Sequence, residues 1–209
     1  PLAVVRSGLE SVEKCSNEEE RNHFLHLMSE ETVHMKRLID DMLLLANSDA
    51  DTLTIKPEAC QPDLLLLDTY EKFEPLAKKN GLHLILTLPE EILPDCFCDI
   101  HRTEQIFSII VDNALCYTPS GGKVTLSCHA ENEMLCFLFK DTGCGISEEK
   151  KSHIFERFYR ADDAHTDREH FGLGLCIAKE LTEKQNGNIQ VVDAPISGSC
   201  FMVQLPCAL

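Results

Sequence analysis

Two glycine-containing stretches of this sequence suit the binding of a flat, anionic ligand. Asp141 ends an apolar run and is followed by Gly143 and Gly145, and a second pair, Gly172 and Gly174, precedes another apolar segment. Glycines let the backbone turn sharply and approach a ligand closely, and exposed amides at a helix N-terminus bind anions. A carboxylate at a strand end accepts a hydrogen bond from an amine such as that of adenine. Each stretch alone is also typical of an ordinary turn.

A third stretch, Asp112-Asn113 followed by Tyr117, lies late in a predicted helix. The amide oxygen of Asn113 is a hard ligand of the kind that Mg²⁺ prefers. Taken alone, an asparagine at such a position is equally typical of a solvated or capping residue.

The charge balance limits the class of partner. The chain has 209 residues, with 19 Lys and Arg against 35 Asp and Glu, and a formal net charge of −16. Such an excess repels phosphates, so it argues against a nucleic-acid or anionic-membrane surface. A small phosphate ligand remains compatible with it, because local donors suffice to hold one.

The chain contains 11 cysteines, none of them in a C-x-x-C pair. Their odd number and the length of the chain predict reduced, mostly buried small hydrophobic residues in a cytosolic protein. A zinc site would need four clustered Cys or His ligands, which the spacing does not display. The apolar runs are too short for a transmembrane segment or a signal peptide, so we expect a cytoplasmic location.

The first 55 residues predict a helical hairpin. Apolar residues recur at helical spacing from Leu2 to Val12, Ser16-Asn17 breaks the pattern, and a longer helix follows, ending near residues 47–51. Two helices cannot bury so broad an apolar stripe, which predicts pairing with a second copy as a four-helix bundle. The alternative is a hairpin that lies on the C-terminal domain of its own chain.

Residues 56–209 mix helix and strand patterns, which favours an α/β sandwich with one helical layer on a mixed sheet. The predicted fold class of the whole chain is therefore α+β: the hairpin, then this second domain. The expected elements are a short strand over 52–56, helices over 64–79, 99–117 and 175–186, strands over 82–88, 123–130, 134–141, 189–192 and 199–205, and a long loop around a short helix over 143–174.

The motifs in their order resemble the nucleotide-binding domain of bacterial sensor histidine kinases. The hairpin resembles the dimerisation and histidine-phosphotransfer domain of that family, which favours it over the gyrase, Hsp90 and MutL-type ATPases of the same ATP-binding fold. The matching boxes are the N box at 109–119 (IIVDNALCYTP), the glycine boxes at 141–146 (DTGCGI), 172–175 (GLGL) and 198–201 (GSCF), and the F box at 154–160 (IFERFYR).

The resemblance implies a role for each matching position. Asn113 would hold Mg²⁺, Asp141 would bind the adenine amine of ATP, and Arg160, in a lid, would approach the γ-phosphate. Phe155 and Phe158 would anchor the lid or meet the hairpin, or simply pack in the core. The other implied binding positions are Tyr117 near the base or ribose, Gly143, Gly145, Ile146 and Leu173 around the base, and Gly172 and Gly174 where the lid swings over the phosphates.

The function implied by the resemblance is that of the cytoplasmic catalytic region of a two-component sensor histidine kinase. It would transfer the γ-phosphoryl group of Mg-ATP to a histidine, release ADP, and pass the phosphoryl group to an aspartate of a response-regulator receiver domain. The chain would form a homodimer through its N-terminal helices and contact neither nucleic acid nor membrane, although the parent would be a membrane-anchored sensor. The phosphoacceptor histidine is expected upstream of Pro1, because none of the nine histidines fits the family context.

Three positions depart from the family pattern. Ile109 stands where an Asn or Glu is common, Cys116 where a phosphate-binding Lys is common, and residues 169–171 where a glycine pair is common. An apolar side chain at position 109 ligates no metal, so we predict weaker ATP binding or turnover. The alternative is a dimeric pseudokinase that binds nucleotide poorly and acts through its conformation or as a phosphatase partner.

Overall fold

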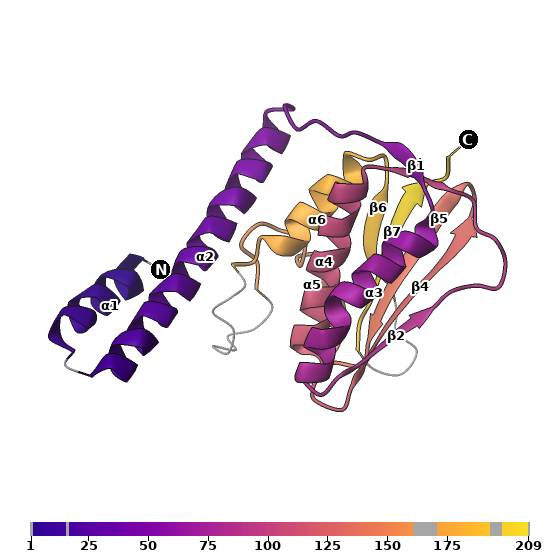
Figure 1. The fold of residues 1–209 in the computed structure, drawn as a ribbon. Coiled ribbons are helices and arrows are strands. Elements are labelled where there is room, and N and C mark those ends of the chain that lie inside the picture. Colours follow the sequence, from indigo (N-terminus) through magenta and orange to yellow (C-terminus); the bar gives the residue numbers. More distant parts are fainter. Residues whose placement is uncertain (1, 16, 161–170, 193–197, 209) are drawn as a thin grey trace. The chain divides into compact units, whose positions relative to one another are not determined.

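The computed structural model describes residues 2–15, 17–160, 171–192 and 198–208. They form two compact units (Figure 1). The first contains α1 (Leu2–Lys14) and α2 (Glu18–Asp49), and the second begins at Thr54 and contains the remaining elements. Among the described residues, no helix combines the length and the apolarity needed to cross a membrane.

Helices α1 and α2 form the predicted hairpin. Helix α2 begins after Asn17, whose side-chain oxygen accepts a hydrogen bond of 3.0 Å from the backbone N–H of Glu19. The two helices approach closely at Gly8, where a Cβ atom would lie 2.6 Å from Cγ of Met28. Met28 is accordingly one of the few buried residues of α2.

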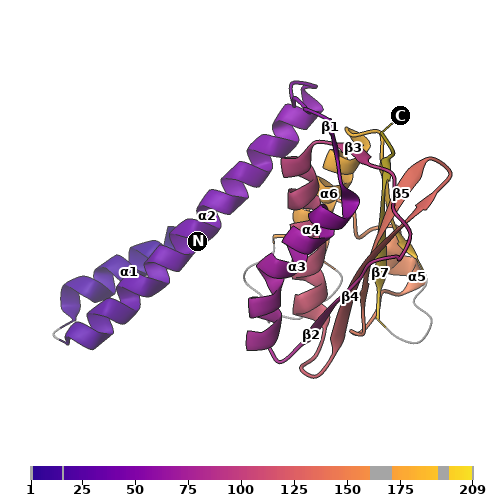
Figure 2. The ribbon, with the colours of Figure 1, turned by 45° about the vertical axis from the view of Figure 1, so that its right-hand side comes forward.

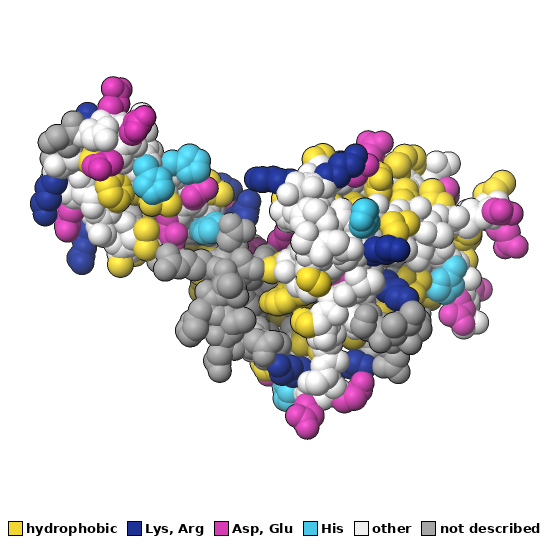
Figure 3. Space-filling view, turned by 90° about the horizontal axis from the view of Figure 1, so that it is seen from below, with side chains coloured by type: hydrophobic (Ala, Val, Ile, Leu, Met, Phe, Trp, Pro, Cys, Tyr) yellow, Lys and Arg dark blue, Asp and Glu magenta, His cyan; other side chains and the backbone are white. Residues whose placement is uncertain are grey.

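Much of the apolar surface of this hairpin is not covered by its own two helices. Hydrophobic side chains reach the surface of the unit on the face shown in Figure 3. The exposed large hydrophobic residues are Leu2, Val4 and Leu9 on α1, and Leu25, Leu27, Val33, Ile39, Met42 and Leu43 on α2.

The second unit contains a five-stranded sheet with the strand order β2-β4-β5-β7-β6. Strand β2 is parallel to β4, and all other neighbours are antiparallel, so the prediction of a mixed sheet is confirmed. The strands are β2 (His83–Thr87), β4 (Lys123–Glu131), β5 (Met134–Asp141), β6 (Asn188–Val192) and β7 (Cys200–Pro206).

Three helices cover one face of this sheet (Figure 2). They are α3 (Pro62–Lys79), α4 (Ile100–Tyr117) and α6 (Gly174–Glu183), and a single helical turn, α5 (Glu148–Lys151), follows β5. In the core between the layers, the ring of Phe107 lies 4.8 and 4.9 Å from the rings of Phe137 and Phe139. The predicted sandwich of one helical layer on a sheet is therefore present.

Two short strands, β1 (Glu58–Cys60) and β3 (Cys96–Cys98), pair antiparallel in a separate two-stranded sheet. The predicted strand over 52–56 was wrong, since residues 52–57 are irregular and the strand begins at Glu58. Local hydrogen bonds explain the difference. The N–H of Thr52 donates to the carbonyl of Asn47, and the N–H of Lys56 donates to Oδ2 of Asp99, so neither joins a β ladder.

Candidate functional site

The candidate site is built around the carboxylate that ends the central strand β5. Side chains alternate along a strand, so Leu135, Phe137, Phe139 and Asp141 all face the helical layer. The first three fill the core, whereas the last inward position carries a carboxylate that is only 4% exposed. The fold therefore places one buried acid at the edge of its apolar core.

Two backbone donors hold this carboxylate in place. Oδ1 of Asp141 accepts hydrogen bonds from the N–H of Gly143 at 2.7 Å and from the N–H of Ser199 at 3.1 Å. Burial raises the pKa of the Asp141 carboxyl, while these backbone hydrogen bonds oppose the rise. A carboxylate has about four lone-pair sites, so it keeps acceptor capacity for an amine of a ligand.

Glycines surround Asp141 because no side chain would fit there. A Cβ atom on Gly143 would collide with the carbonyl oxygen of Tyr117, and one on Gly198 would collide with the carbonyl oxygen of Asp141 itself. Gly198 also has a φ of +90°, a conformation that L side chains rarely adopt. The first and the last glycine boxes thus meet around one carboxylate, although they are far apart in the sequence.

Gly145 and Ile146 continue the loop after β5. Gly145 has a φ of +76°, and a Cβ atom there would lie 3.1 Å from the carbonyl oxygen of Gly198. The side chain of Ile146 is half-buried. Both residues therefore belong to the loop that turns beside Asp141.

Helix α4 brings the N-box residues to the same end of the unit. Asn113 is half-buried, and its Nδ2 donates a hydrogen bond of 2.9 Å to the carbonyl oxygen of Ile109. This bond uses the amide nitrogen, so the amide oxygen is the atom with the chemistry to bind a hard cation. Tyr117 ends the helix with a side chain that is 55% exposed, and its carbonyl group contacts Gly143.

The start of helix α6 lies against α4. Gly174 is the first residue of α6, and a Cβ atom there would lie 3.2 Å from Cγ2 of Ile109. Leu173, at the N-cap position, is buried. The N box and the second glycine box are therefore neighbours, and Ile109 fills the contact between them.

The F box lies beside Gly172. The N–H of Phe158 donates to the carbonyl oxygen of Gly172 at 2.9 Å, and both residues have positive φ, +63° and +73°. Phe155 contacts Phe201 of β7 edge-on with a ring separation of 6.4 Å, whereas the side chain of Phe158 is 60% exposed. The two phenylalanines thus differ, with one tied to the sheet and the other presented to solvent.

Arg160, the predicted γ-phosphate contact, is exposed at the end of the described F-box segment. Residues Glu169 and His170, which depart from the family pattern, lie outside the described residues, and Phe171 is half-buried. A second guanidinium that the motif analysis did not assign, that of Arg157, lies 4.0 Å from the carboxylate of Glu180 on α6.

Ser199 is a residue of this site to which the sequence analysis gave no role. Its backbone exchanges hydrogen bonds with Asp141, donating to Oδ1 and accepting at 2.9 Å from the Asp141 N–H. The signal was present in the match of residues 198–201 to a closing glycine box. The contact itself depends on the pairing of β5 with β7, which no local pattern reveals.

The chain resembles known proteins both in sequence and in fold. Residues 98–209 match the family described as histidine kinase-, DNA gyrase B-, and HSP90-like ATPase. The adaptive-response sensory kinase SasA of Rippkaea orientalis is 30% identical over 214 residues, which cover 99% of this chain and 54% of that protein. The chain thus spans about half the length of this curated relative.

Two solved structures share the fold. Full-length ShkA in complex with AMPPNP matches with a TM-score of 0.80 and 26% identity, over 96% of this chain and 42% of that one. Histidine kinase ThkA, in complex with response regulator protein TrrA, matches with a TM-score of 0.77 and 18% identity, over 100% and 58%. The match to the family extends over more than half of the chain and includes Asp141, Asn113 and all the glycine boxes. This chain is therefore a member of the histidine kinase-, DNA gyrase B- and HSP90-like ATPase family, and its relatives are sensor histidine kinases.

Proposed function

We propose that this chain is the catalytic region of a two-component sensor histidine kinase that binds Mg-ATP and transfers its γ-phosphoryl group to a histidine. The observation that carries the proposal is the buried carboxylate of Asp141, held by backbone donors and enclosed by glycines that leave room for no side chain. This construction suits an acceptor for an exocyclic amine of a flat base, which approaches the backbone closely. The two backbone donors and the close backbone contacts at Gly143 and Gly198 hold this carboxylate in one orientation, which suits a recognition role.

In this proposal each element contributes one part of the site. Asp141 accepts a hydrogen bond from the adenine amine, the loop with Gly143, Gly145 and Ile146 encloses the base, and Tyr117 covers the base or ribose. The half-buried amide of Asn113 suits a hard cation, because its oxygen is a neutral, oriented ligand. When bound, Mg²⁺ would neutralise charge on the phosphates.

The remaining residues act on the phosphates. Gly172 and Leu173 lead into helix α6, which begins at Gly174, and backbone N–H groups at a helix N-terminus favour an anion. Arg160 supplies a guanidinium for the γ-phosphate, and its positive charge stabilises negative charge in the transition state of in-line transfer. Because phosphoryl transfer is driven by positioning and electrostatics, these contacts account for the catalysis expected of the chain.

The helical hairpin supplies the second half of the proposed function. We place a dimerisation and phosphotransfer hairpin in residues 1–55 and the ATP-binding domain in residues 56–209. The exposed apolar residues of α1 and α2 favour a homodimer with a four-helix core. The phosphoryl group would then pass to a receiver-domain aspartate of a response regulator, with the chain in the cytoplasm. A response regulator protein, TrrA, is the partner in the ThkA complex.

A second function, that of a pseudokinase, is favoured by Ile109. This side chain occupies the contact between α4 and the start of α6, and it offers no ligand atom near Asn113. A protein with this substitution could bind nucleotide weakly and signal through its conformation.

The test that separates the two functions is incubation of the protein, extended upstream of Pro1, with γ-labelled ATP and Mg²⁺. Label that is stable to base and lost in acid would mark phosphohistidine and support the kinase. Absence of label, together with measurable ATP binding by calorimetry, would support the pseudokinase. Absence of both label and binding would contradict the proposed site.

A further inference from the structure

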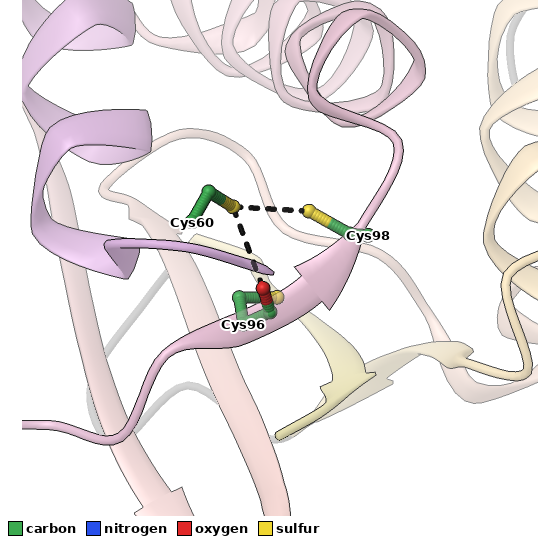
Figure 4. A group of neighbouring side chains, drawn as sticks. All are labelled: Cys60, Cys96 and Cys98. Atoms are coloured by element: carbon green, nitrogen blue, oxygen red, sulfur yellow. Dashed lines mark hydrogen bonds between the residues drawn. The ribbon is translucent and has the colours of Figure 1, made fainter. Parts of the chain in front are cut away.

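Three cysteines that are distant in the sequence form a cluster outside the nucleotide site. The sulfur atoms of Cys60, Cys96 and Cys98 all lie within 4.8 Å of one another, and the Sγ atoms of Cys60 and Cys98 are 3.4 Å apart (Figure 4). Cys96 and Cys98 have no exposed surface, whereas Cys60 is half-buried. The cluster is therefore enclosed on the β3 side and accessible only at Cys60.

The pairing of β1 with β3 creates this arrangement. Cys60 is the register partner of Cys96, and Cys98 lies two residues further along β3. Side chains alternate along a strand, so Cys96 and Cys98 share one face, while Phe97 between them points the other way and is 45% exposed. Three thiols thus converge on one side of a two-stranded sheet.

We propose that Cys60, Cys96 and Cys98 bind a thiophilic d¹⁰ metal ion, Zn²⁺ or Cu⁺, through their three thiolates. Metal–sulfur bonds of about 2.3 Å place three ligand sulfurs roughly 3.8–4.0 Å apart. The present separations, from 3.4 Å to within 4.8 Å, bracket that spacing, so small side-chain rotations suffice. Each thiol that binds the ion releases its proton to solvent, and no electron is transferred.

The coordination that the cluster offers suits both ions. The half-buried Cys60 leaves one side of the cluster toward solvent, so a water molecule can complete the four ligands that Zn²⁺ prefers. Soft thiolate ligands also select Cu⁺, an ion that a set of three thiolates can bind.

The geometry disfavours a disulfide between Cys60 and Cys98. Their sulfurs are 3.4 Å apart, but the two residues stand on a diagonal of the ladder, where Cα atoms are about 7–8 Å apart. A disulfide requires Cα atoms within about 6.8 Å. The Cys60 thiol also donates to the carbonyl oxygen of Cys96, the directly opposed residue, at 3.6 Å.

The test is metal titration of the reduced chain under anaerobic conditions, with Zn²⁺ and Cu⁺ in separate arms. Each arm uses a chromophoric chelator as competitor, and native mass spectrometry counts the ions bound. We expect one ion per chain, with the arm of higher affinity identifying the metal. Substitution by Co²⁺ should add the sulfur-to-cobalt charge-transfer absorption that reports thiolate ligands.

Two variants make the test specific. Cys60→Ser removes the accessible ligand and should weaken binding by more than ~100-fold, whereas Cys128→Ser alters a buried cysteine of β4 outside the cluster and should leave it unchanged. Circular dichroism establishes that both variants fold, and the cobalt spectrum of the unaltered chain tests the ligands without any substitution. Absence of binding in both arms, retention of full affinity in folded Cys60→Ser, or a metal-free chain that has lost two hydrogen atoms to a disulfide would each overturn the proposal.

Discussion

The carboxylate of Asp141 combines its proposed recognition role with a cost to the folded state. It is almost fully buried, and burial raises its pKa. An amide of the same shape would keep an acceptor oxygen for the backbone N–H groups of Gly143 and Ser199. The same amide would bring no charge into the core. An amide at this position should therefore weaken ligand binding without lowering the stability of the fold.

Asp141→Asn should weaken ATP binding roughly 10- to 100-fold, because a hydrogen bond to a charged acceptor is lost. The same variant should unfold at an equal or higher temperature at neutral pH. Calorimetry with Mg-ATP and thermal unfolding measure the two effects, with exposed Asp68→Asn as the control that changes neither. A variant that binds ATP normally would contradict the assigned role.

The raised pKa of Asp141 also has a pH signature. As pH rises from acid, the unfolded chain loses this proton before the folded chain does. The contribution of Asp141 to the free energy of unfolding therefore falls with pH until the pKa of the folded chain is passed, and stays at its lower value above it. The free energy of unfolding of the unaltered chain should therefore fall, relative to that of Asp141→Asn, as pH rises above the usual aspartate range. Urea titrations of both proteins at a series of pH values measure this difference, and parallel curves would contradict it.

Gly198→Ala should destabilise the ATP-binding unit by about 3 kcal/mol or more. The new Cβ would strike the Asp141 carbonyl and would also occupy a φ of +90°. Gly121→Ala is the matched control, since its φ is +84° but nothing lies within 4 Å of its Cβ position. Gly121→Ala should lower the free energy of unfolding by only about 1–2 kcal/mol. Urea unfolding measures both variants, and equal losses would show that the close contact of Gly198 with the Asp141 carbonyl does not matter.

Local patterns predicted the residue types at the site but not their contacts. The acid at the end of an apolar strand and the glycines after it are visible in sequence, because strand alternation and glycine geometry are local properties. The bond between Asp141 and Ser199 depends on β5 lying beside β7. The role of Ile109 likewise required the contact with Gly174, which joins two helices.

Helix α4 ends with a turn in which Cys116 replaces the family's usual lysine. A cation in the last turn of a helix interacts favourably with the helix dipole and would also attract a phosphate. Cys116→Lys should therefore tighten Mg-ATP binding by roughly three- to tenfold, with the gain reduced at high ionic strength. Calorimetric titration at two salt concentrations measures this effect.

Cys116→Met is the control for this change, because it lengthens the side chain without adding charge. We expect the affinity of the Met variant to remain that of the unaltered chain. Equal tightening by Met and Lys would show that packing, rather than charge, acts at this position.

Element boundaries were predictable where a periodic pattern was long. The helices over 64–79 and 99–117 and the pair of strands over 123–130 and 134–141 were confirmed to within a few residues. Strands β1 and β3 each have three residues, too few for an alternating pattern to be recognised. Their pairing brings together cysteines that the sequence separates, which is why the spacing did not suggest a metal site.

At the scale of the whole molecule, the uncovered apolar surface of the hairpin is the feature with the largest consequence. We expect the chain to sediment as a dimer, and the double change Ile39→Glu and Leu43→Glu to convert it to a monomer, because it places charges among exposed apolar residues of α2. Arg37→Glu, on an exposed polar position of the same helix, is the control and should remain dimeric.

Analytical ultracentrifugation distinguishes these states. Thermal unfolding of the ATP-binding unit should be the same in all three proteins, since the changes lie in the other unit. A monomeric unaltered chain would refute the dimer and favour a hairpin that packs within its own chain.

The buried cysteines can report the local opening of individual helices and strands. Buried free thiols occur throughout the second unit, with Cys98 before α4, Cys128 in β4, Cys136 in β5, Cys176 in α6 and Cys200 in β7. A buried thiol reacts with an alkylating reagent only while its surroundings open, so each labelling rate measures the local opening of one element. A time course read by peptide mass spectrometry, with and without nucleotide, would therefore map which elements ATP holds closed.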